Sequence, residues 1–542
     1  MQKNSPDNLL QRLEELNAIG VALSGEKDIN RLLEAILQAA IHITQCDAGT
    51  LYSVSEEDRT LRFEIVRTNS LGIALGGTTG KPVTFPPVPL HDAAGQPNNH
   101  NVVAYAVLND RTVNIADAYS EQGFDFSGTR KFDAANHYRS RSFLTVPMKN
   151  HEGKIIAVLQ LLNALDPGSG EVTTFSVSDQ HLAESLASQA AIALTNRALI
   201  NQLEELFEAF INLINIAIDE KSPYTGGHCE RVPELTMLLA EAVHNTEQGP
   251  LAGFRMTDKD RYELKIAGLL HDCGKVTTPV HVVDKATKLQ TLFDRIHLID
   301  TRFEILKRDA EIALLKQKAA LEAGGKDVAD IENSYRQRIA QLDSDREFLR
   351  KSNVGGEFMA PALQQRVRDI GAYRWVNEQG EECDFLTPDE IYCLNVEKGT
   401  LTAEEREIIN HHIVATIHML EALPWPDHLR KVPEYAGGHH ERMDGRGYPK
   451  GLKGSEMSVQ ARMMAVADIF EALTAKDRPY KLGKTLSEAL TILGRMKLDQ
   501  HVDPDLFDIF IRNQVYLQYA KNHLEPYQID EVDVGKIPGY TP

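Results

Sequence analysis

The stretch "GLLHDCGKVTTP", residues 268–279, ends an apolar helical run with His271, Asp272 and Lys275. An imidazole next to a carboxylate is a weak signal alone, because a long chain contains such a pair by chance. Other candidates stand beside short turns or inside helical patterns: His228, His411, His412, His439, His440 and Asp468. Taken singly, each is explained as a buried hydrogen-bonded side chain or a helix cap. Their meaning therefore depends on whether they act as a group.

As a group, these side chains indicate metal chemistry. Imidazole together with carboxylate suits iron, manganese, nickel or zinc, whereas calcium and magnesium sites are dominated by oxygen. Adjacent His-Asp and His-His pairs let one turn supply two metal centres, with the carboxylate bridging. Two ions about 3.5–4 Å apart clamp a phosphate and activate a bridging water. We therefore expect two divalent ions, with iron or manganese as first candidates and nickel or zinc as alternatives.

Length and charge limit the classes of protein to consider. A chain of 542 residues exceeds what one hydrophobic core normally supports, so at least two domains are expected. The formal net charge is −20, which argues against binding to nucleic-acid polymers or to anionic membranes. The charge of an anionic ligand must then be neutralised at its binding site, by a metal ion or by a few cationic side chains.

The cysteines and the apolar stretches predict the compartment. The five cysteines form no CxxC pair, which favours a reducing compartment without disulfides; they are Cys46, Cys229, Cys273, Cys383 and Cys393. No signal peptide is apparent, and "IIAVLQLL" is far shorter than the ~20 residues that span a bilayer. The sequence predicts a cytoplasmic protein.

The N-terminal region, residues 1–177, reads as an α+β domain. Helical spacing covers residues 7–44, and four strand-like segments follow: "GTLYSV", "LRFEIVRT", "SFLTVPMK" and "KIIAVLQLLN". Loops rich in glycine and proline separate them. The order of a helical segment, several strands and a closing helix predicts an antiparallel sheet covered by helices.

This region resembles a GAF domain over roughly residues 10–197, through "CDAGTLYSV", "FLTVPMKNHEGKIIAVLQLLNA" and "FSVSDQHLAESLASQAAIALTN". The resemblance implies a small-molecule sensor. Cyclic-nucleotide-binding members carry an Asn-Lys-Phe-Asp-Glu signature, and the corresponding residues here are Asn163, Ala164, Phe175, Asp179 and Gln180. Because the lysine and glutamate are missing, we expect another ligand or a role in dimerisation.

Residues 178–221 contain no proline or glycine, so one helix on the order of 65 Å long is allowed. Its apolar residues alternate spacings of four and three: Leu199, Leu203, Leu206, Phe210, Leu213 and Ala217. This heptad pattern predicts a parallel coiled coil in a homodimer. The alternative is that the seam packs on its own chain.

In the second half, "HDCGK" followed by "HHERMDGRGYP" looks like the HD-GYP family, bacterial phosphodiesterases of cyclic dinucleotides within the all-helical, metal-dependent HD superfamily. The match covers roughly residues 222–288 and 400–500, inside a domain expected over 222–525 with a C-terminal tail at 526–542. The resemblance implies seven metal ligands, with Asp272 bridging: His228, His271, Asp272, His412, His439, His440 and Asp468. His412 fits better than His411 because Leu420 matches the family's leucine eight residues on.

The same resemblance implies a substrate side. Asp272 and Lys275 become catalytic residues, with Lys275 as a cation beside the phosphate or the attacking water. The expected substrate-binding residues are those of the glycine-rich loop and two cations of "DRPYK": Gly445, Gly447, Tyr448, Arg478 and Lys481. Two departures from the family stand near the ligands, where Glu471 replaces an aspartate and Thr416 a common glycine.

Residues from about 290 to 399 have no counterpart in the family. Apolar residues spaced by threes and fours from Leu289 to Ala313 predict a helix, Gly324 and Gly325 break it, and a second helix follows. We expect a helical hairpin and then a mixed segment from about Asn353. The charged hairpin is either a solvated face or a docking arm.

The resemblance to the HD-GYP family implies a phosphodiesterase that cleaves cyclic di-GMP to linear pGpG, with slow further cleavage to GMP. The residue four before His228 is Tyr224, where three-metal members carry a glutamate, so a two-metal site is expected. One alternative is another substrate such as cyclic GMP-AMP. The other is a slow or inactive receptor that binds a cyclic dinucleotide or a diguanylate cyclase as an adaptor. The N-terminal domain is expected to regulate the activity.

Overall fold

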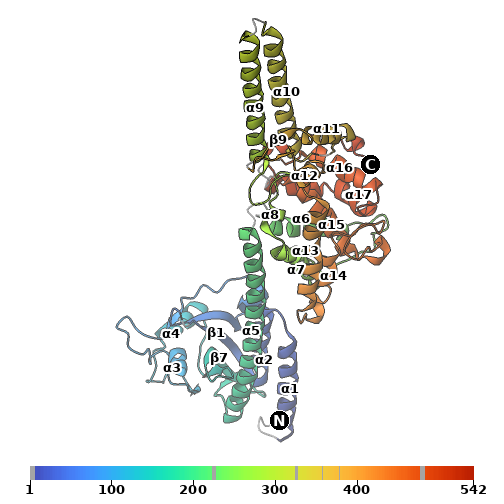
Figure 1. Cartoon of the computed structure of the whole chain (residues 1–542). Coiled ribbons are helices and arrows are strands. Elements are labelled where there is room, and N and C mark those ends of the chain that lie inside the picture. Colours follow the sequence, from blue (N-terminus) through green and yellow to red (C-terminus); the bar gives the residue numbers. More distant parts are fainter. Residues whose placement is uncertain are drawn as a thin grey trace. The chain divides into compact units, whose positions relative to one another are not determined.

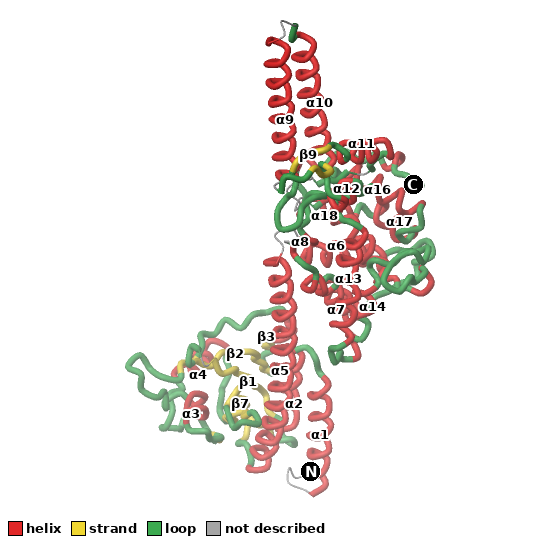
Figure 2. Tube along the Cα trace, in the orientation of Figure 1, coloured by secondary structure: helices red, strands yellow, loops and turns green. Residues whose placement is uncertain are grey.

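The computed structural model describes residues 6–55, 57–221, 227–323, 327–356, 358–377, 379–475 and 483–541. The described chain forms two compact units, Met1–Phe207 and Glu208–Pro542. Strands lie mainly in the first unit and helices dominate the second, as the colours of Figure 2 show. None of the described helices is both long enough and apolar enough to cross a membrane.

The first unit is an antiparallel sheet with helices on both faces. The strand order is β3-β2-β1-β7-β6-β5, with β4 on β2 and β8 on β7. The strands are β1 (Cys46–Ser55), β2 (Thr60–Thr68), β3 (Ile73–Gly76), β4 (Val88–Pro89), β5 (Val113–Ile115), β6 (Phe143–Lys149), β7 (Ile155–Leu165) and β8 (Val172–Thr173). The helices that precede or interrupt them are α1 (Pro6–Gly25), α2 (Ile29–Thr44), α3 (Val102–Leu108) and α4 (Ser127–Asn136). All four predicted strands are present.

Each face of the sheet has its own hydrophobic core, because successive side chains of a strand point to opposite faces. On β1, Leu51 packs into the core shared with α1, α2 and the start of α5. The next residue, Tyr52, packs into the core shared with α3. The expected α+β architecture is therefore confirmed.

Two residues of the altered GAF signature are occupied by internal contacts. Asp179, near the start of α5 (Val177–Lys221), forms a buried ion pair with Arg12 at 2.7 Å. The Asn163 amide donates to the Tyr138 hydroxyl and to the Arg139 carbonyl, both at 2.8 Å. Both side chains thus have a structural role in this domain.

Helix α5 begins in the first unit and ends in the second. The long helix predicted from residues 178–221 is therefore present. Its predicted seam is open to solvent in the single chain, with exposed fractions of 45–64% at Leu199, Leu203, Leu206, Phe210 and Leu213. These five large apolar side chains thus form an exposed stripe along α5.

The second unit is built from helices (Figure 1). They are α6 (His228–His244), α7 (Asp258–Leu270), η2 (Cys273–Thr277), α8 (Val280–Val283), α13 (Ala403–Glu421), α14 (Val432–Gly437), α15 (Val459–Thr474), α16 (Leu486–Leu498), α17 (Pro504–Arg512) and α18 (Val515–His523). Helix α6 packs against α7 and α15, and the short turn η2 packs against α13. These contacts bring together the segments that carry the candidate ligands.

The expected insertion forms a hairpin and a small mixed segment. Figure 1 shows α9 (Ile296–Ala323) and α10 (Ala329–Asn353) side by side, joined along their length by ion pairs such as Asp300–Arg350 at 2.9 Å and Lys318–Glu332 at 2.8 Å. The mixed segment follows as α11 (Pro361–Gly371), β9 (Arg374–Val376), β10 (Glu382–Asp384) and α12 (Pro388–Leu394). Phe303 and Phe385 anchor a hydrophobic core of its own. Gly324 and Gly325 lie outside the described residues.

Residues 526–541, which the sequence set apart as a tail, pack onto the helical unit. The Gln528 amide donates to the Thr474 carbonyl at 2.8 Å. The Lys497 ammonium donates to the Gly539 carbonyl at 2.6 Å, and Ile537 is buried. The apolar residues of this segment follow neither a helical nor a strand spacing, so periodicity gave no sign of this packing.

Candidate metal centre

Asp272 lies at the centre of the cluster. It follows the end of α7, and its buried carboxylate faces histidines from three segments. Oδ2 is 3.1 Å from His228 Nε2 and 3.2 Å from His271 Nε2. Oδ1 is 3.3 Å from His412 Nε2 on α13. One carboxylate therefore faces ligands on both sides, which is the geometry that a bridging role requires.

The other candidate ligands surround this carboxylate. On α15, Asp468 Oδ1 lies 3.3 Å from His228 Nε2. After α14, the rings of His439 and His440 have centroids 4.1 Å apart. Ligand atoms lie within 4.8 Å of one another in three sets: His228, His271 and Asp468; His271, Asp272 and His439; and His412, His439 and His440. All seven predicted ligands meet at one place, whereas His411 is exposed on α13.

Three of the histidines are fixed in the same tautomer. In each, Nδ1 forms a hydrogen bond with a backbone carbonyl three residues earlier; the pairs are His271 with Gly268 at 2.7 Å, His439 with Ala436 at 2.6 Å, and His412 with Ile409. Because a carbonyl only accepts, Nδ1 must carry the hydrogen. The Nε2 atom of each neutral ring then presents a lone pair to the centre, which is the form that binds a metal.

Several of the converging atoms lack a hydrogen-bond partner. Among the described residues these include Nε2 of His228, His271 and His439 and Oδ1 of Asp272, all buried. Leaving a buried polar atom unpaired costs about 1–3 kcal/mol. Divalent transition metals would coordinate all four of these atoms, since imidazole nitrogen and carboxylate oxygen are their usual ligands. The side chains therefore fit the metal centre that the sequence predicts.

Burial shifts the pKa values of several side chains in the cluster. Burial, aided by the neighbouring His440, lowers the pKa of His439 well below its usual value. Burial also lowers the pKa of His440 to about 4. Burial opposes the charge on Asp272, but Lys275 and His271 outweigh it and hold the pKa of this carboxyl well below its ordinary value. His439 and His440 are thus neutral and Asp272 is ionised. Burial opposes a charge on His228, but Asp272, Asp468 and Glu471 outweigh it and raise the pKa of His228 well above its usual value.

Lys275 contacts the bridging candidate directly, with its Nζ 2.5 Å from Asp272 Oδ2. Burial disfavours the ammonium charge, but the Asp272 carboxylate outweighs that effect and raises the pKa of Lys275. Lys275 is therefore a protonated cation at the edge of the metal cluster.

Glu471 has a role that the sequence did not reveal. Its buried carboxylate accepts from His228 Nδ1 and from Arg231 Nε, each at 2.6 Å. Burial alone would raise the pKa of Glu471, but the hydrogen bonds and charges of these two partners lower it below its ordinary value. Glu471 follows Asp468 by three positions and so shares its face of α15. That spacing was the available signal.

Thr416, the second departure, joins the turn η2 to α13. Its buried hydroxyl accepts from the Gly274 backbone N–H at 2.9 Å. A Cβ at Gly274 would lie 2.0 Å from the His412 carbonyl oxygen, so only glycine fits here. This close approach holds the segment of Asp272 and Lys275 against the helix of His412.

The glycine-rich loop lies beside the ligands. The Tyr448 ring stacks on His440 with centroids 4.8 Å apart. Gly445 has a φ of +77°, and a Cβ at Gly447 would lie 2.4 Å from the Arg442 backbone nitrogen, so both glycines are needed for the shape of the loop. The other two predicted substrate contacts, Arg478 and Lys481, and also Tyr224, lie outside the described residues.

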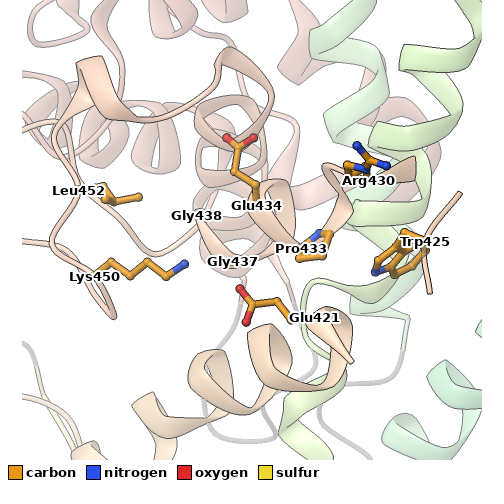
Figure 3. A pocket seen from close by; sticks show the side chains of 9 residues that line it. All are labelled: Glu421, Trp425, Arg430, Pro433, Glu434, Gly437, Gly438, Lys450 and Leu452. Carbon is orange, nitrogen blue, oxygen red and sulfur yellow. The ribbon is translucent and has the colours of Figure 1, made fainter. Parts of the chain in front are cut away.

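A cleft of about 360 Å³ lies next to this centre (Figure 3). Its lining includes Gly437 and Gly438, the residues directly before His439, but none of the seven candidate ligands. Figure 3 shows the Lys450 side chain extending toward the space between Glu421 and Glu434. The cleft is therefore separate from the metal cluster.

Comparison with known protein families agrees with the division into an α+β domain and a helical domain. Residues 28–194 match the GAF domain, and residues 225–340 and 385–506 match two descriptions of the HD domain. The chain carries a GAF domain and an HD domain. Between the two HD matches lie residues 341–384, within the inserted segment.

The chain is also similar to curated bacterial enzymes. It is 36% identical over 135 residues to 3′3′-cGAMP-specific phosphodiesterase 1 of Vibrio cholerae, covering 25% of this chain and 30% of that protein. It is 32% identical over 188 residues to a probable cyclic di-GMP phosphodiesterase of the same species, covering 34% and 38%. A cyclic di-GMP phosphodiesterase of Thermotoga maritima is 36% identical over 125 residues, covering 23% and 32%. The aligned part thus spans about a third of each relative.

Proposed function

We propose that this protein is a metal-dependent phosphodiesterase that hydrolyses cyclic di-GMP to linear pGpG. The main support is the convergence of seven histidine and aspartate side chains, four atoms of which are buried without a hydrogen-bond partner among the described residues. The relatives named as cyclic-dinucleotide phosphodiesterases support the substrate class.

In this proposal the seven side chains would hold two divalent ions, and Asp272 would contribute to both. When bound, such ions neutralise phosphate charge and activate a water molecule for attack on phosphorus. The backbone carbonyls and Glu471 keep the imidazoles oriented, so little reorganisation is needed as the substrate reacts. Lys275 holds a proton beside Asp272 and faces the developing phosphate charge. Tyr448 limits access to His440 by stacking on it.

Iron or manganese is the proposed metal, with nickel or zinc as alternatives, because the donor set is mostly imidazole. We propose two ions rather than three, since Tyr224 replaces the glutamate of three-metal members. A phenol stays neutral at pH 7 and is a poor substitute for a carboxylate. Linear pGpG should then accumulate and GMP form slowly.

The second candidate substrate is cyclic GMP-AMP. It is favoured by the similarity to a phosphodiesterase named for 3′3′-cGAMP. The metal centre acts on a phosphodiester common to both nucleotides, so the bases must be distinguished by residues around it. A receptor that binds a cyclic dinucleotide or a diguanylate cyclase without turnover is the remaining alternative.

The deciding experiment is metal analysis of the purified chain followed by product analysis on cyclic di-GMP, 3′3′-cGAMP and linear pGpG. We expect two metal ions per chain and linear pGpG as the first product. Metal-loaded protein that binds cyclic di-GMP but never cleaves it would support the receptor. Three ions per chain would contradict the proposed metal count.

The choice of His412 rather than His411 as a metal ligand is tested by a matched pair of variants on α13. His412→Ala should lower the metal content and abolish turnover, because His412 Nε2 faces Asp272. His411→Ala is the control and should retain both, since His411 is exposed. Equal metal loss in the two variants would show that this choice is incorrect.

We further propose that the chain is a homodimer joined through the seam of α5, and that the GAF domain binds a small molecule and regulates the HD domain. The seam supports the first proposal because its five large apolar residues are exposed in a heptad pattern. The continuous helix supports the second.

A further inference from the structure

The last turn of α5 contacts the turn that carries Asp272. Lys221, the final residue of the helix, lies with its Nζ 3.3 Å from the Lys275 carbonyl and also donates to the Val276 carbonyl. Both carbonyls belong to η2, which directly follows Asp272. A cation placed on backbone carbonyls in this way is stabilised by their partial negative charge.

The same turn of α5 also contacts the start of α6. Asp219 Oδ2 accepts from the Gly227 backbone N–H at 3.2 Å. Gly227 is the residue before His228 and caps the helix that carries this ligand. Side chains two positions apart therefore hold the two segments that place His228 and Asp272, whose facing atoms are 3.1 Å apart.

A wider face of α5 packs into the second unit. Ile211, Asn215 and Ile218 are buried, at spacings of four and three residues. Glu208 forms an ion pair of 3.2 Å with Lys265 on α7, the helix that ends at His271. The end of α5 is thus attached to α7, η2 and the start of α6.

We propose that the last turn of α5 is a positioning element for the metal centre, in which Lys221 holds η2 and Asp219 holds the start of α6. A shift or rotation of α5 then changes the separation between His228 and Asp272. Because α5 continues without a break from the unit that contains the GAF domain, this contact gives the sensor a direct mechanical route to the metal site. In this proposal both side chains act on backbone groups, and neither is a metal ligand.

The test compares Lys221→Met, which keeps the length of the side chain but removes its donors, with Lys221→Arg, which keeps donors. Apo protein is titrated with Mn²⁺, and kcat and KM are measured on cyclic di-GMP. Lys221→Met should weaken Mn²⁺ binding and lower kcat by about 10-fold each with KM unchanged. Lys221→Arg should restore both to near the wild-type values.

Asp219→Ala tests the second contact and should weaken Mn²⁺ binding in the same direction. The matched control is Glu220→Ala, an exposed carboxylate in the same helical turn, which should behave as wild type. Wild-type Mn²⁺ affinity in both Lys221→Met and Asp219→Ala would overturn the inference. The measurement of kcat rests on the proposed phosphodiesterase function, whereas the measurement of Mn²⁺ binding does not. A wild-type protein that shows no turnover would therefore reject the phosphodiesterase function alone.

Discussion

Glu471 orients one candidate ligand from the helix that carries another. Its carboxylate holds His228 Nδ1 while Asp468, one turn earlier on α15, faces His228 Nε2. A histidine that donates its second N–H to a carboxylate is fixed in orientation and becomes a more basic ligand. Arg231 binds the other oxygen of Glu471, so this buried carboxylate keeps its charge.

Glu471→Gln should therefore weaken metal binding without removing a ligand. Glutamine keeps the shape of the side chain but loses the negative charge that polarises His228. We expect Mn²⁺ affinity to fall by about 10-fold in a titration of the apo protein. Glu230→Gln, at an exposed position on α6, is the control. Unchanged affinity in Glu471→Gln would mean that other contacts suffice to orient His228.

The ligand candidates were accessible from sequence because each belongs to a short motif with its own spacing. The choice of His412 over His411 agrees with the burial of the first and the exposure of the second. Spacing places Glu471 on the face of Asp468, but the partners of Glu471 and Thr416 depend on which helices pack together. Glu471 and His228 are 243 positions apart, and local periodicity carries no information about such a pair.

At the scale of elements, length decided what could be predicted. Strands of seven residues or more, such as β1 and β7, and the uninterrupted helix α5 have a clear period. The three-residue strand β5 and the two-residue strand β8 are too short to show one. The insertion was predicted as a hairpin from its heptads, but its separate core around Phe303 and Phe385 depends on contacts between α9 and the segment after α11.

The base of the insertion contains a buried cation. Lys288 donates to the carbonyls of Leu394 and Val396, at 2.9 and 2.8 Å, and thereby joins the chain entering the insertion to the end of α12. Its partners are carbonyls and the Met359 sulfur rather than a carboxylate. Burial accordingly lowers the pKa of Lys288 to about 8.

This pKa predicts how stability changes with pH. Between about pH 8 and the unfolded-state value near 10.4, the folded chain binds fewer protons at Lys288 than the unfolded chain, so stability rises with pH. The free energy of unfolding of wild type relative to Lys288→Met should increase by roughly 2 kcal/mol from pH 8 to pH 10. Urea denaturation of both proteins across this range measures the difference. A difference that is constant with pH would show that Lys288 titrates normally.

At the scale of the whole molecule, the order of GAF domain, connecting helix and HD domain followed from sequence because each part has a distinct pattern. Strand alternation, an unbroken heptad and the spaced histidine motifs do not overlap along the chain. The contact of α5 with the metal centre was not foreseen, since Lys221 and Asp219 resemble ordinary charged residues at a helix end. Only the packing of α5 on η2 and α6 gives them a role.

The proposed coupling between the seam of α5 and the metal centre makes a prediction for the proposed homodimer. Inserting four residues near Asn201 interrupts the seven-residue repeat. The part of the seam before the insertion is then rotated against the last turn of α5 by about 50°. Inserting seven residues preserves the repeat. We expect the four-residue insertion to change kcat on cyclic di-GMP and the seven-residue insertion to restore it, because only the first alters the angle at which Lys221 and Asp219 meet the catalytic domain. Light scattering on both variants establishes whether each is still a dimer. Equal kcat in a dimeric wild type and in both insertions would mean that α5 is a passive tether.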